Sequence, residues 1–246
     1  MNIRKSICIF LLVIFTVGFY NTAHSQTTDT LVNGLIGHWK FDSINTLITP
    51  DESGTGNTGT VGTSSRLVPG RFGQALRMDT GGSQQFMTIK NNFGSPQWSV
   101  STWVNPDVPI ATSSPYSGAY TFFSADQAPS GTSRMLLVTK DDVRTYGGSI
   151  GRYSFGNNPG WHHVVVTYNG TSLSAYVDGT LRGTIPYTNI LANSIKRYIG
   201  TNAGPARGHV FVGSTEETRL YNRVLNTAET TALPNNRANT VTTTPV

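Results

Sequence analysis

Cysteine is almost absent from this chain of 246 residues, because the only one is Cys8, inside an apolar segment near the N-terminus. If export removes that segment, the rest of the chain contains no thiol. It then cannot form a disulfide, bind zinc through cysteine or use a thiol nucleophile. Cys8 also lacks the Leu-x-Gly/Ala context of a bacterial lipoprotein cysteine, so a lipid anchor is not expected.

Charge is also scarce, since Asp, Glu, Lys and Arg together make up 13% of the residues. Without Arg4 and Lys5, the chain keeps 16 of its 18 basic residues against 13 acidic ones, a net charge of +3. The basic residues are scattered, and Lys196-Arg197 is the densest pair. No basic stripe could follow a phosphate backbone, so nucleic acid is not an expected partner.

No apolar run is long enough to cross a bilayer comfortably, the longest being Ile7 to Tyr20. Arg4 and Lys5 precede it, and the small residues of Ala23-His24-Ser25 follow it, as in a secretory signal peptide. We therefore predict a cleaved signal peptide over residues 1–25, with an uncleaved anchor as the alternative. The mature protein is then secreted or held at the cell surface or in the periplasm, without stable membrane insertion.

After residues 1–25, the commonest sequence patterns are those of tight turns and of strands with alternating apolar and polar residues. The stretch WHHVVVTYNGTSLSAYVDGTLRG (161–183) predicts an antiparallel meander, because Asn169-Gly170 and Asp178-Gly179 supply the positive φ angles of hairpin turns. In the segment 97–107, alternation places Trp98, Val100 and Thr102 on one face and Ser99, Ser101 and Trp103 on the other. Further strands are predicted at 35–41, 75–79, 86–90, 121–125, 134–140, 143–150, 196–200, 210–212 and 218–221.

One short helix is predicted near the C-terminus, where Asn226 can cap it, Glu229 completes a capping box and Pro234 ends it. No second apolar unit and no fixed repeat is visible. The chain is therefore predicted to be an all-β protein in which two antiparallel sheets form a sandwich, with this single helix. We expect a polar leader at 26–33, the domain at 34–234 and a disordered tail at 235–246.

Six phrases, in order, resemble the laminin-G-like, concanavalin A-like lectin/glucanase jelly-roll domains of secreted bacterial proteins. They span Leu35 to Leu233 and read LIGHWKFD, DESGTGNTGT, LVPGRFGQALRMD, WSVSTWVNPD, GWHHVVVTYNGTSLSAYVDG and TRLYNRVLNTAE. The resemblance implies a jelly roll that binds glycans or proteins, often with a structural calcium ion.

The resemblance also implies where calcium would bind. Hard oxygen donors occur at the family's loop positions, namely Asp42, Asp51, Asn57 and Glu216. The alternative is that DESGTGNTG (51–59) is simply a turn in which Asp and Asn bond their own backbone. The family's usual Gly-x-Ile-Asp-Glu-Val-Arg is here GSTEETR (213–219), so Thr215 and Glu216 stand where the family has Ile and Asp. Glutamate can still bind calcium, but its extra methylene group moves the carboxylate.

Catalysis is not expected, although some glucanases share this fold. A glycoside hydrolase needs two carboxyl groups at a defined separation, and the usual Glu-x-Asp-x-Glu type of motif is missing. The adjacent pairs Asp141-Asp142 and Glu216-Glu217 are expected to point to opposite faces of a strand. The same alternation separates His162 from His163, so both are interpreted as structural.

Aromatic and polar side chains of the loops are the predicted ligand contacts, since sugar rings stack on aromatic faces while polar groups bind their hydroxyls. The alternative for each tyrosine is a half-buried structural role. The predicted ligand-binding residues are Tyr116, Tyr120, Arg144, Tyr146, Arg152, Tyr153, Asn157 and Asn158. By contrast, Trp39, Trp98, Trp103 and Trp161 follow strand patterns and are predicted to be mostly core.

We therefore expect a secreted, non-catalytic module that binds a polysaccharide or surface glycan. The first alternative is a protein-interaction or adhesion module of the same fold, whose partner would be a surface protein. The second alternative is a glycoside hydrolase.

Overall fold

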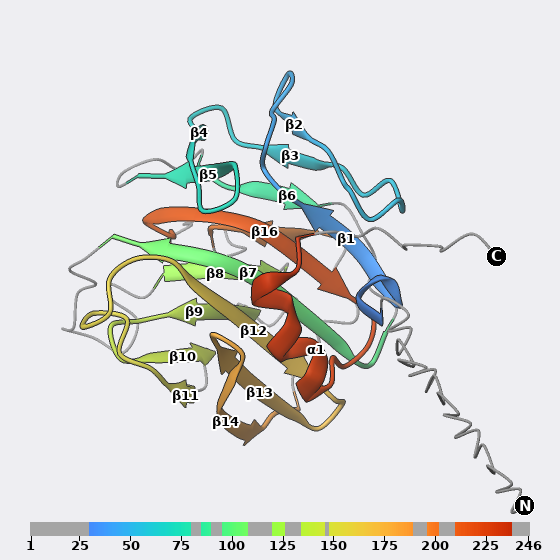
Figure 1. Ribbon diagram of the computed structural model, residues 1–246, viewed down its shortest axis with the longest axis vertical. Helices are drawn as coiled ribbons and strands as arrows, with labels where there is room; N and C mark the ends of the chain where they lie inside the picture. Colours follow the sequence, from blue (N-terminus) through green and yellow to red (C-terminus); the bar gives the residue numbers. More distant parts are fainter. Residues whose placement is uncertain are drawn as a thin grey trace, which may run out of the picture.

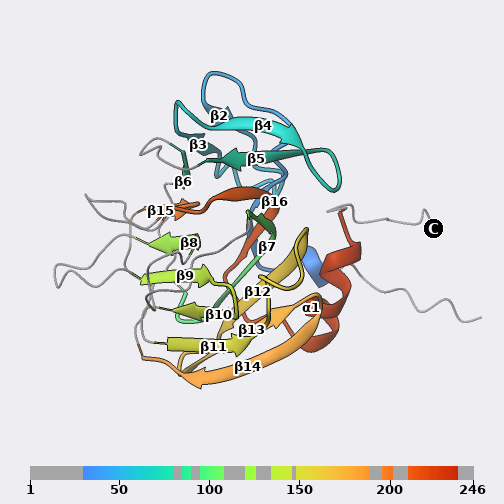
Figure 2. The ribbon, with the colours of Figure 1, turned by 90° about the vertical axis from the view of Figure 1, so that its left-hand side faces the viewer.

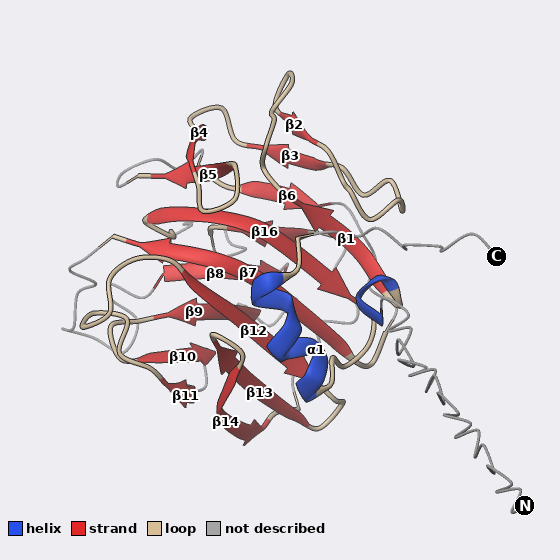
Figure 3. Cartoon of the chain, in the orientation of Figure 1, coloured by secondary structure: helices blue, strands red, loops and turns tan. Residues whose placement is uncertain are grey.

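The computed structural model describes residues 30–79, 85–89, 95–107, 120–125, 134–145, 148–188, 196–201 and 210–237. Within these ranges the strands form two eight-stranded antiparallel sheets, packed face to face as a sandwich (Figures 1 and 2). In the described part of the chain, strands dominate and the helices are short (Figure 3). The all-β two-sheet architecture predicted from the sequence is confirmed. The predicted signal peptide and most of the predicted tail lie outside the described residues.

The first sheet, sheet A, faces the viewer in Figure 1 and has β7 and β16 at its centre. Tyr221 of β16 pairs with Leu35 of β1 and with Ser99 of β7, so β16 joins both ends of the chain to the middle of the sheet. In spatial order its strands are β14 (Thr180–Pro186), β13 (Ser172–Val177), β12 (His162–Tyr168), β7 (Trp98–Pro106), β16 (Gly213–Tyr221), β5 (Gln74–Met78) and β4 (Arg66–Pro69), with β1 (Leu35–Trp39) beside β16.

The second sheet, sheet B, lies behind sheet A in Figure 1 and to its left in Figure 2. Its strands in spatial order are β11 (Gly148–Arg152), β10 (Asp142–Thr145), β9 (Arg134–Val138), β8 (Tyr120–Ala125), β15 (Arg197–Ile199), β6 (Met87–Ile89), β3 (Gly59–Val61) and β2 (Ile48–Thr49). Consecutive strands β8 to β11 pair as a meander, whereas β15 returns from far along the chain to lie between β8 and β6.

The main core fills the space between the sheets, and its composition follows from strand alternation. Trp98, Val100 and Val104 of β7 belong to it, whereas Ser99 and Ser101 lie on the other face of sheet A. Burying such large apolar side chains contributes about 1.5–3 kcal/mol each, so this layer supplies most of the folding free energy. The faces predicted for β7 are therefore correct.

A smaller apolar cluster lies on the outer side of sheet A, under α1 (Thr227–Ala232) and the 3₁₀ turn η2 (Leu233–Asn235). Its members are Leu31, Leu35, Val165, Tyr176, Tyr221, Leu225 and Leu233. Another 3₁₀ turn, η1 (Thr30–Val32), supplies Leu31. The predicted capping box of α1 is present, since Asn226 and Glu229 each accept the other's backbone N–H. None of the helices in the described ranges is long and apolar enough to span a bilayer.

Some boundaries differ from the sequence-based predictions. The segment predicted as one strand at 143–150 is divided between β10 and β11. The predicted gap after residue 212 is instead part of the nine-residue strand β16, Gly213–Tyr221. A β-bulge lies in this strand between Glu216 and Arg219, where Glu217 has a φ of 52°. Trp161, predicted to be mostly core, is partly buried just before β12.

The edges of the two sheets touch through glycines. A Cβ on Gly183 of β14 would lie 2.2 Å from the carbonyl oxygen of Ile150, and one on Gly151 of β11 would lie 2.7 Å from Cβ of Arg182. Neither contact is possible for a larger residue without displacement. Two glycines therefore let β11 and β14 meet backbone to backbone and cover each other's edge.

A strained hairpin tip gives a prediction about stability. Thr46 and Leu47 have φ angles of 47° and 64° in the turn between Asn45 and Ile48. A β-branched residue is disfavoured there by roughly 1 kcal/mol, whereas asparagine tolerates this region. We expect Thr46→Asn to raise the melting temperature by about 1–4 °C in calorimetry. The matched change Thr60→Asn, on an exposed position of strand β3, should not raise it.

Candidate functional site

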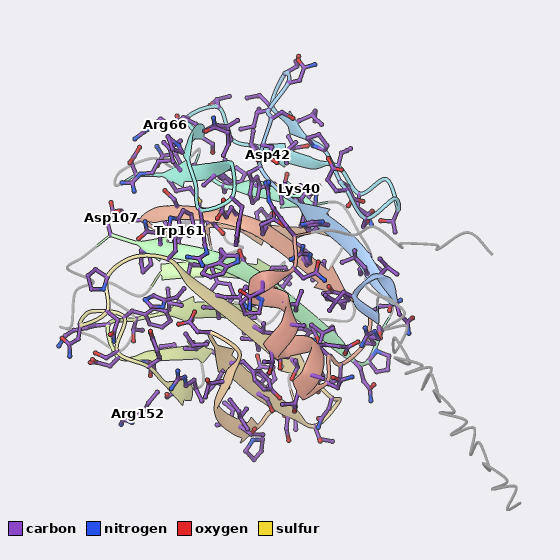
Figure 4. All side chains as sticks on the ribbon, in the orientation of Figure 1. Lys40, Asp42, Arg66, Asp107, Arg152 and Trp161 are labelled. Carbon is purple, nitrogen blue, oxygen red and sulfur yellow. The ribbon has the colours of Figure 1, made fainter. Side chains whose placement is uncertain are left out.

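The loop that connects β11 to β12 carries most of the predicted ligand residues that the structure describes. Arg152, Asn157 and Asn158 are exposed, and Arg152 projects from the body of the sandwich (Figure 4). The loop runs from the edge of sheet B to the start of β12 in sheet A (Figure 1). It therefore presents polar side chains at a rim where both sheets end, a common position for binding residues.

A buried face of the same loop is fixed by His162. Its Nε2 donates to the carbonyl oxygen of Asn158 at 2.8 Å, and its Nδ1 lies 2.9 Å from Oδ2 of Asp178. Burial lowers the pKa of His162, but the bond to Asp178 and the Asn158 carbonyl outweigh it and raise that pKa above 6.5. Asp178 also accepts the backbone N–H of His163 at 2.9 Å, so one carboxylate holds the start of β12 and the loop.

Tyr153 supports this arrangement from inside. Its ring packs on Phe155 and His162 with centroids 4.8 and 5.0 Å apart, and the guanidinium of Arg182 lies 4.9 Å from its centroid. Its hydroxyl lies 3.0 Å from Nδ1 of His162. Burial, followed by the charge of Asp178, raises the pKa of this hydroxyl. The contacts of Tyr153 match the half-buried structural alternative.

The other predicted ligand residues are not gathered at this loop. Tyr116 and Tyr146 lie outside the described residues, and Tyr120 is in β8 with its side chain outside them. Arg144 lies on β10, half-buried, with its guanidinium 3.9 Å from Asp142. The structure thus brings together Tyr153 and Asn158, with Arg152 and Asn157 beside them in the chain. Sequence reasoning missed Asp178, whose only signal was the hairpin turn that contains it.

Trp161 at the end of this loop differs from the other three tryptophans. Trp39 is fully buried and donates its Nε1–H to the carbonyl of Asn57, and Trp98 packs against Tyr168. Trp103 packs against His163. Trp161 is partly buried, and no described residue makes a ring contact or hydrogen bond with its side chain. Part of its indole is therefore exposed to solvent.

A second surface lies on the outer face of sheet A, around Trp103. Here the turn between β4 and β5 folds over the sheet and places Phe72 edge-on to Trp103, with centroids 5.7 Å apart. The exposed guanidinium of Arg71 lies 4.4 Å from the Trp103 centroid. Glu216 holds this turn by accepting the backbone N–H groups of Arg71 and Phe72 at 2.9 and 3.3 Å. Sequence reasoning missed the whole cluster.

Glu216 and Glu217 lie on the same face of sheet A, contrary to the prediction that adjacent residues separate. Thr215 and Thr218 both contact the hydroxyl of Thr102 at 2.8 Å on the inner face, so the bulge between them turns both glutamates outward. Both are buried, with 0% and 1% exposure. Burial raises the pKa of Glu216 despite its two backbone donors. The pair is enclosed by protein, without access for a glycosidic bond.

Glu217 is the acceptor of a buried charge network. His38 donates its Nε2–H to it at 2.7 Å, while Arg237 and Arg219 approach it at 2.7 and 3.2 Å. Burial alone would raise the pKa of Glu217, but the bond from His38 and the charge of Arg219 lower it. The carboxylate therefore stays ionised, and it serves the fold.

The four predicted calcium ligands are held in three separate sets of interactions. Asp51 accepts backbone N–H groups of His38 and Asn57, each at 2.8 Å, and those interactions organise its own loop. Asp42 binds Arg237 at 2.7 Å, and Glu216 binds the β4–β5 turn. Among the described residues no three His, Cys, Asp or Glu side chains are grouped to hold a metal. The residues as arranged do not fit one shared ion, and calcium binding stays a prediction.

The two antiparallel sheets, packed face to face, form a jelly-roll sandwich. A laminin-G family profile, described as the concanavalin A-like lectin/glucanases superfamily, matches residues 80–230. This range is more than half of the chain, and the protein belongs to that family. The resemblance drawn from the sequence is thereby confirmed. A search of curated protein sequences finds no match.

Solved structures with the same fold are mainly binding domains. The binding domain of Paraclostridial Mosquitocidal Protein 1 aligns with a TM-score of 0.61 and 16% identity, over 82% of this chain and 52% of its own. A structure of botulinum neurotoxin type C, whose cell entry depends on interaction with two ganglioside molecules, aligns with a TM-score of 0.61 and 16% identity over 84% and 52%. This chain therefore spans about half the length of those toxin chains.

A third similar structure has nearly the same length as the matched region. Domain 4 of AbnA, a GH43 extracellular arabinanase from Geobacillus stearothermophilus, was solved with arabinotriose. It aligns with a TM-score of 0.57 and 19% identity, over 81% of this chain and 97% of that domain. At these identities the alignments establish the shared fold.

The His162–Asp178 contact predicts a pH dependence of stability. The raised pKa of His162 contributes stability that is complete below pH 6.5 and is lost as pH rises through its folded value. The lowered pKa of Asp178 contributes stability above pH 3.8 that is lost as pH falls through its folded value. The contribution of the pair is therefore greatest between roughly pH 4 and 6.5.

Asp178→Asn tests this contact, because asparagine keeps the shape and tolerates the φ of 52° at this turn. In an NMR titration the imidazole pKa of His162 should fall to or below its usual value, since burial then acts without the carboxylate. The loss of melting temperature should be larger at pH 5 than at pH 8.5. Asp141→Asn, at an exposed aspartate outside this contact, should leave both unchanged, and an unaltered His162 titration in Asp178→Asn would contradict the assignment.

Proposed function

We propose that this protein is a non-catalytic module that binds a polysaccharide or surface glycan at the loop 152–161. The observation that carries the proposal is Trp161, a partly exposed indole with no ring or hydrogen-bond partner among the described residues. Carbohydrate rings stack their apolar faces on such side chains, and leaving an indole in water has no benefit for the fold.

The polar side chains of the loop complement that stacking face. Arg152 and Asn157 are exposed, and neither side chain has a hydrogen-bond partner in the described part of the chain. Their donors and acceptors are therefore available to sugar hydroxyls. Because His162 and Asp178 fix the loop from inside, little conformational entropy would be lost on binding.

The similar structures support a glycan ligand over other partners. One was solved with arabinotriose, and the cell entry of another depends on gangliosides. Both ligands are carbohydrates or carry them, and both belong to chains with this fold. The proposal extends that chemistry to this chain, whose own sugar and linkage the comparisons do not specify.

Export is part of the same proposal. A glycan of a cell surface or of extracellular material is accessible only to a protein that leaves the cytoplasm. The sequence pattern of residues 1–25 predicts that route through cleavage after Ser25. N-terminal sequencing of the protein recovered from the culture medium or cell envelope would test the cleavage.

A glycan array followed by calorimetric titration of the best hit tests the binding function. The intact protein should bind saturably without releasing reducing ends, and Trp161→Ala should weaken binding about tenfold or more, because stacking energy is lost. Ile48→Ala is the matched control, since Ile48 is 39% exposed on β2, at the opposite edge of sheet B from β11.

Other outcomes would favour the alternatives. Absence of binding to any glycan, together with capture of one defined surface protein that Trp161→Ala abolishes, would favour the protein-interaction module. New reducing ends, lost on mutation of a single carboxylate, would establish a glycoside hydrolase.

Calcium is proposed as a structural ion only on the family resemblance, and its test is independent of glycan binding. A bound ion at a hundred times its dissociation constant would stabilise the fold by ~2.7 kcal/mol. Chelation should then lower the melting temperature by several degrees, and added calcium should restore it. An unchanged melting temperature under chelator would exclude a stabilising ion.

A further inference from the structure

An arginine packs against two aromatic rings on the outer face of sheet A. The guanidinium of Arg71 lies 4.4 Å from the Trp103 ring centroid and 5.2 Å from that of Phe72. An arginine packed on aromatic rings can still donate hydrogen bonds to a ligand through its N–H groups. Arg71 is exposed, and no described carboxylate forms an ion pair with it.

Other arginines near this end of sheet A are neutralised. Arg77 binds Asp107 and Asp79, and Arg66 also binds Asp79 at 3.2 Å. Arg237 binds Asp42 and Glu217. Arg71 differs from these because its partners are aromatic rings and its charge has no described counterion.

The position of Arg71 is fixed by the protein. Its turn is anchored by Glu216, whose carboxylate oxygens accept the backbone N–H groups of Arg71 and Phe72. Gly70 permits this approach, because a Cβ there would lie 2.2 Å from Oε2 of Glu216. The arginine is therefore preorganised, and binding an anion would need little rearrangement.

Strand register places Trp161 close to this arginine. His163 pairs with Trp103 across β12 and β7, and Trp161 lies two residues before His163, just before the start of β12. An extended chain rises about 3.3 Å per residue, so Trp161 lies within roughly two residue lengths of the residue that pairs with Trp103. Figure 4 shows Trp161 at this end of sheet A. One monosaccharide stacked on Trp161 could reach Arg71 with a substituent of its ring.

Among the described residues, little else at this surface would repel an anion. Burial lowers the pKa of the adjacent His163 to about 3, so its ring is neutral. Glu216 directs its oxygens at the turn, and Asp107 is held by Arg77. Asn105, which follows Val104 in β7, is half-buried and adds a neutral polar group.

We propose that the glycan contains an acidic sugar, a uronate or sialic acid, whose ring stacks on Trp161 and whose carboxylate is bound by Arg71. This inference rests on the proposed glycan-binding function and narrows its ligand class. A guanidinium can bind a carboxylate through two parallel hydrogen bonds, which a neutral hydroxymethyl group at the same position cannot replace. Binding should therefore discriminate between sugars that differ only in that group.

Titration of matched oligosaccharides tests the proposal on the intact protein. The probes are oligogalacturonate with its carboxyl-reduced counterpart, hyaluronan fragments with theirs, and sialyllactose with lactose. The acidic member of at least one pair should bind about tenfold or more tightly, and its advantage should shrink as salt is raised, because the pair is solvent-accessible.

Variants separate the charge from the stacking face. Arg71→Gln should reduce the affinity for the acidic probe to that for its neutral counterpart and leave the neutral affinity unchanged, whereas Trp161→Ala should weaken both. Arg66→Gln, which removes another exposed arginine of sheet A, should change neither. Since Arg71 is exposed, all three variants should fold, as melting curves would verify.

The two levels of the proposal fail in different ways. Equal affinity for both members of every pair, or an acidic preference that survives in Arg71→Gln, would overturn the acidic-sugar assignment while leaving glycan binding intact. Absence of binding to every probe and to every glycan on the array would overturn the proposed function itself.

Discussion

The carboxylate of Glu217 connects parts of the chain that are far apart in sequence. His38 reaches it from β1, Arg219 from β16 itself and Arg237 from beyond α1. An uncompensated charge buried at this depth would cost several kcal/mol, so the ionised group requires its partners in place. The first strand, the central strand and the C-terminal segment are thereby held in one arrangement over sheet A. The backbone bulge that turns Glu217 outward also turns Glu216 outward, and Glu216 anchors the turn that carries Arg71. The proposed recognition surface thus depends on the same irregularity as the fold.

Much of the fold could be predicted because its determinants are local. Hairpin turns at Asn169-Gly170 and Asp178-Gly179, the alternation of β7 and the capping box of α1 each act within a few residues. The bulge in β16 could not be predicted, because nothing in the sequence GSTEETR indicates that Glu217 takes a positive φ angle. That conformation is stabilised by His38 and Arg237, about 180 residues before it and 20 after it. Strand alternation, applied without the bulge, separated two glutamates that the fold places on one face.

The candidate site was only partly predictable for a similar reason. Loop composition correctly indicated that Arg152, Asn157 and Asn158 are exposed, since polar loop residues seldom find a buried position. Tyr153 was predicted as a ligand contact and Trp161 as mostly core, and the structure leaves both partly buried. The tyrosine packs among His162, Phe155 and Arg182, whereas no described residue makes a ring contact with the tryptophan. Their sequence contexts are similar, and only the packing around the loop distinguishes them. Arg71 and Asp178 gain their importance from cross-strand neighbours that no local pattern reveals.

The contact between Gly151 and Gly183 bears on how such a module can diversify. Because even a methyl group at Gly183 would meet the Ile150 carbonyl, neither position can accept a side chain without separating the edges of the two sheets. The loop that begins directly after β11 carries no comparable restriction on its exposed side chains. Substitutions that alter ligand preference can therefore accumulate one residue away from an edge that tolerates almost none. Because the sterically restricted contact between β11 and β14 lies beside a loop whose exposed side chains can change, ligand specificity could change while the fold is kept.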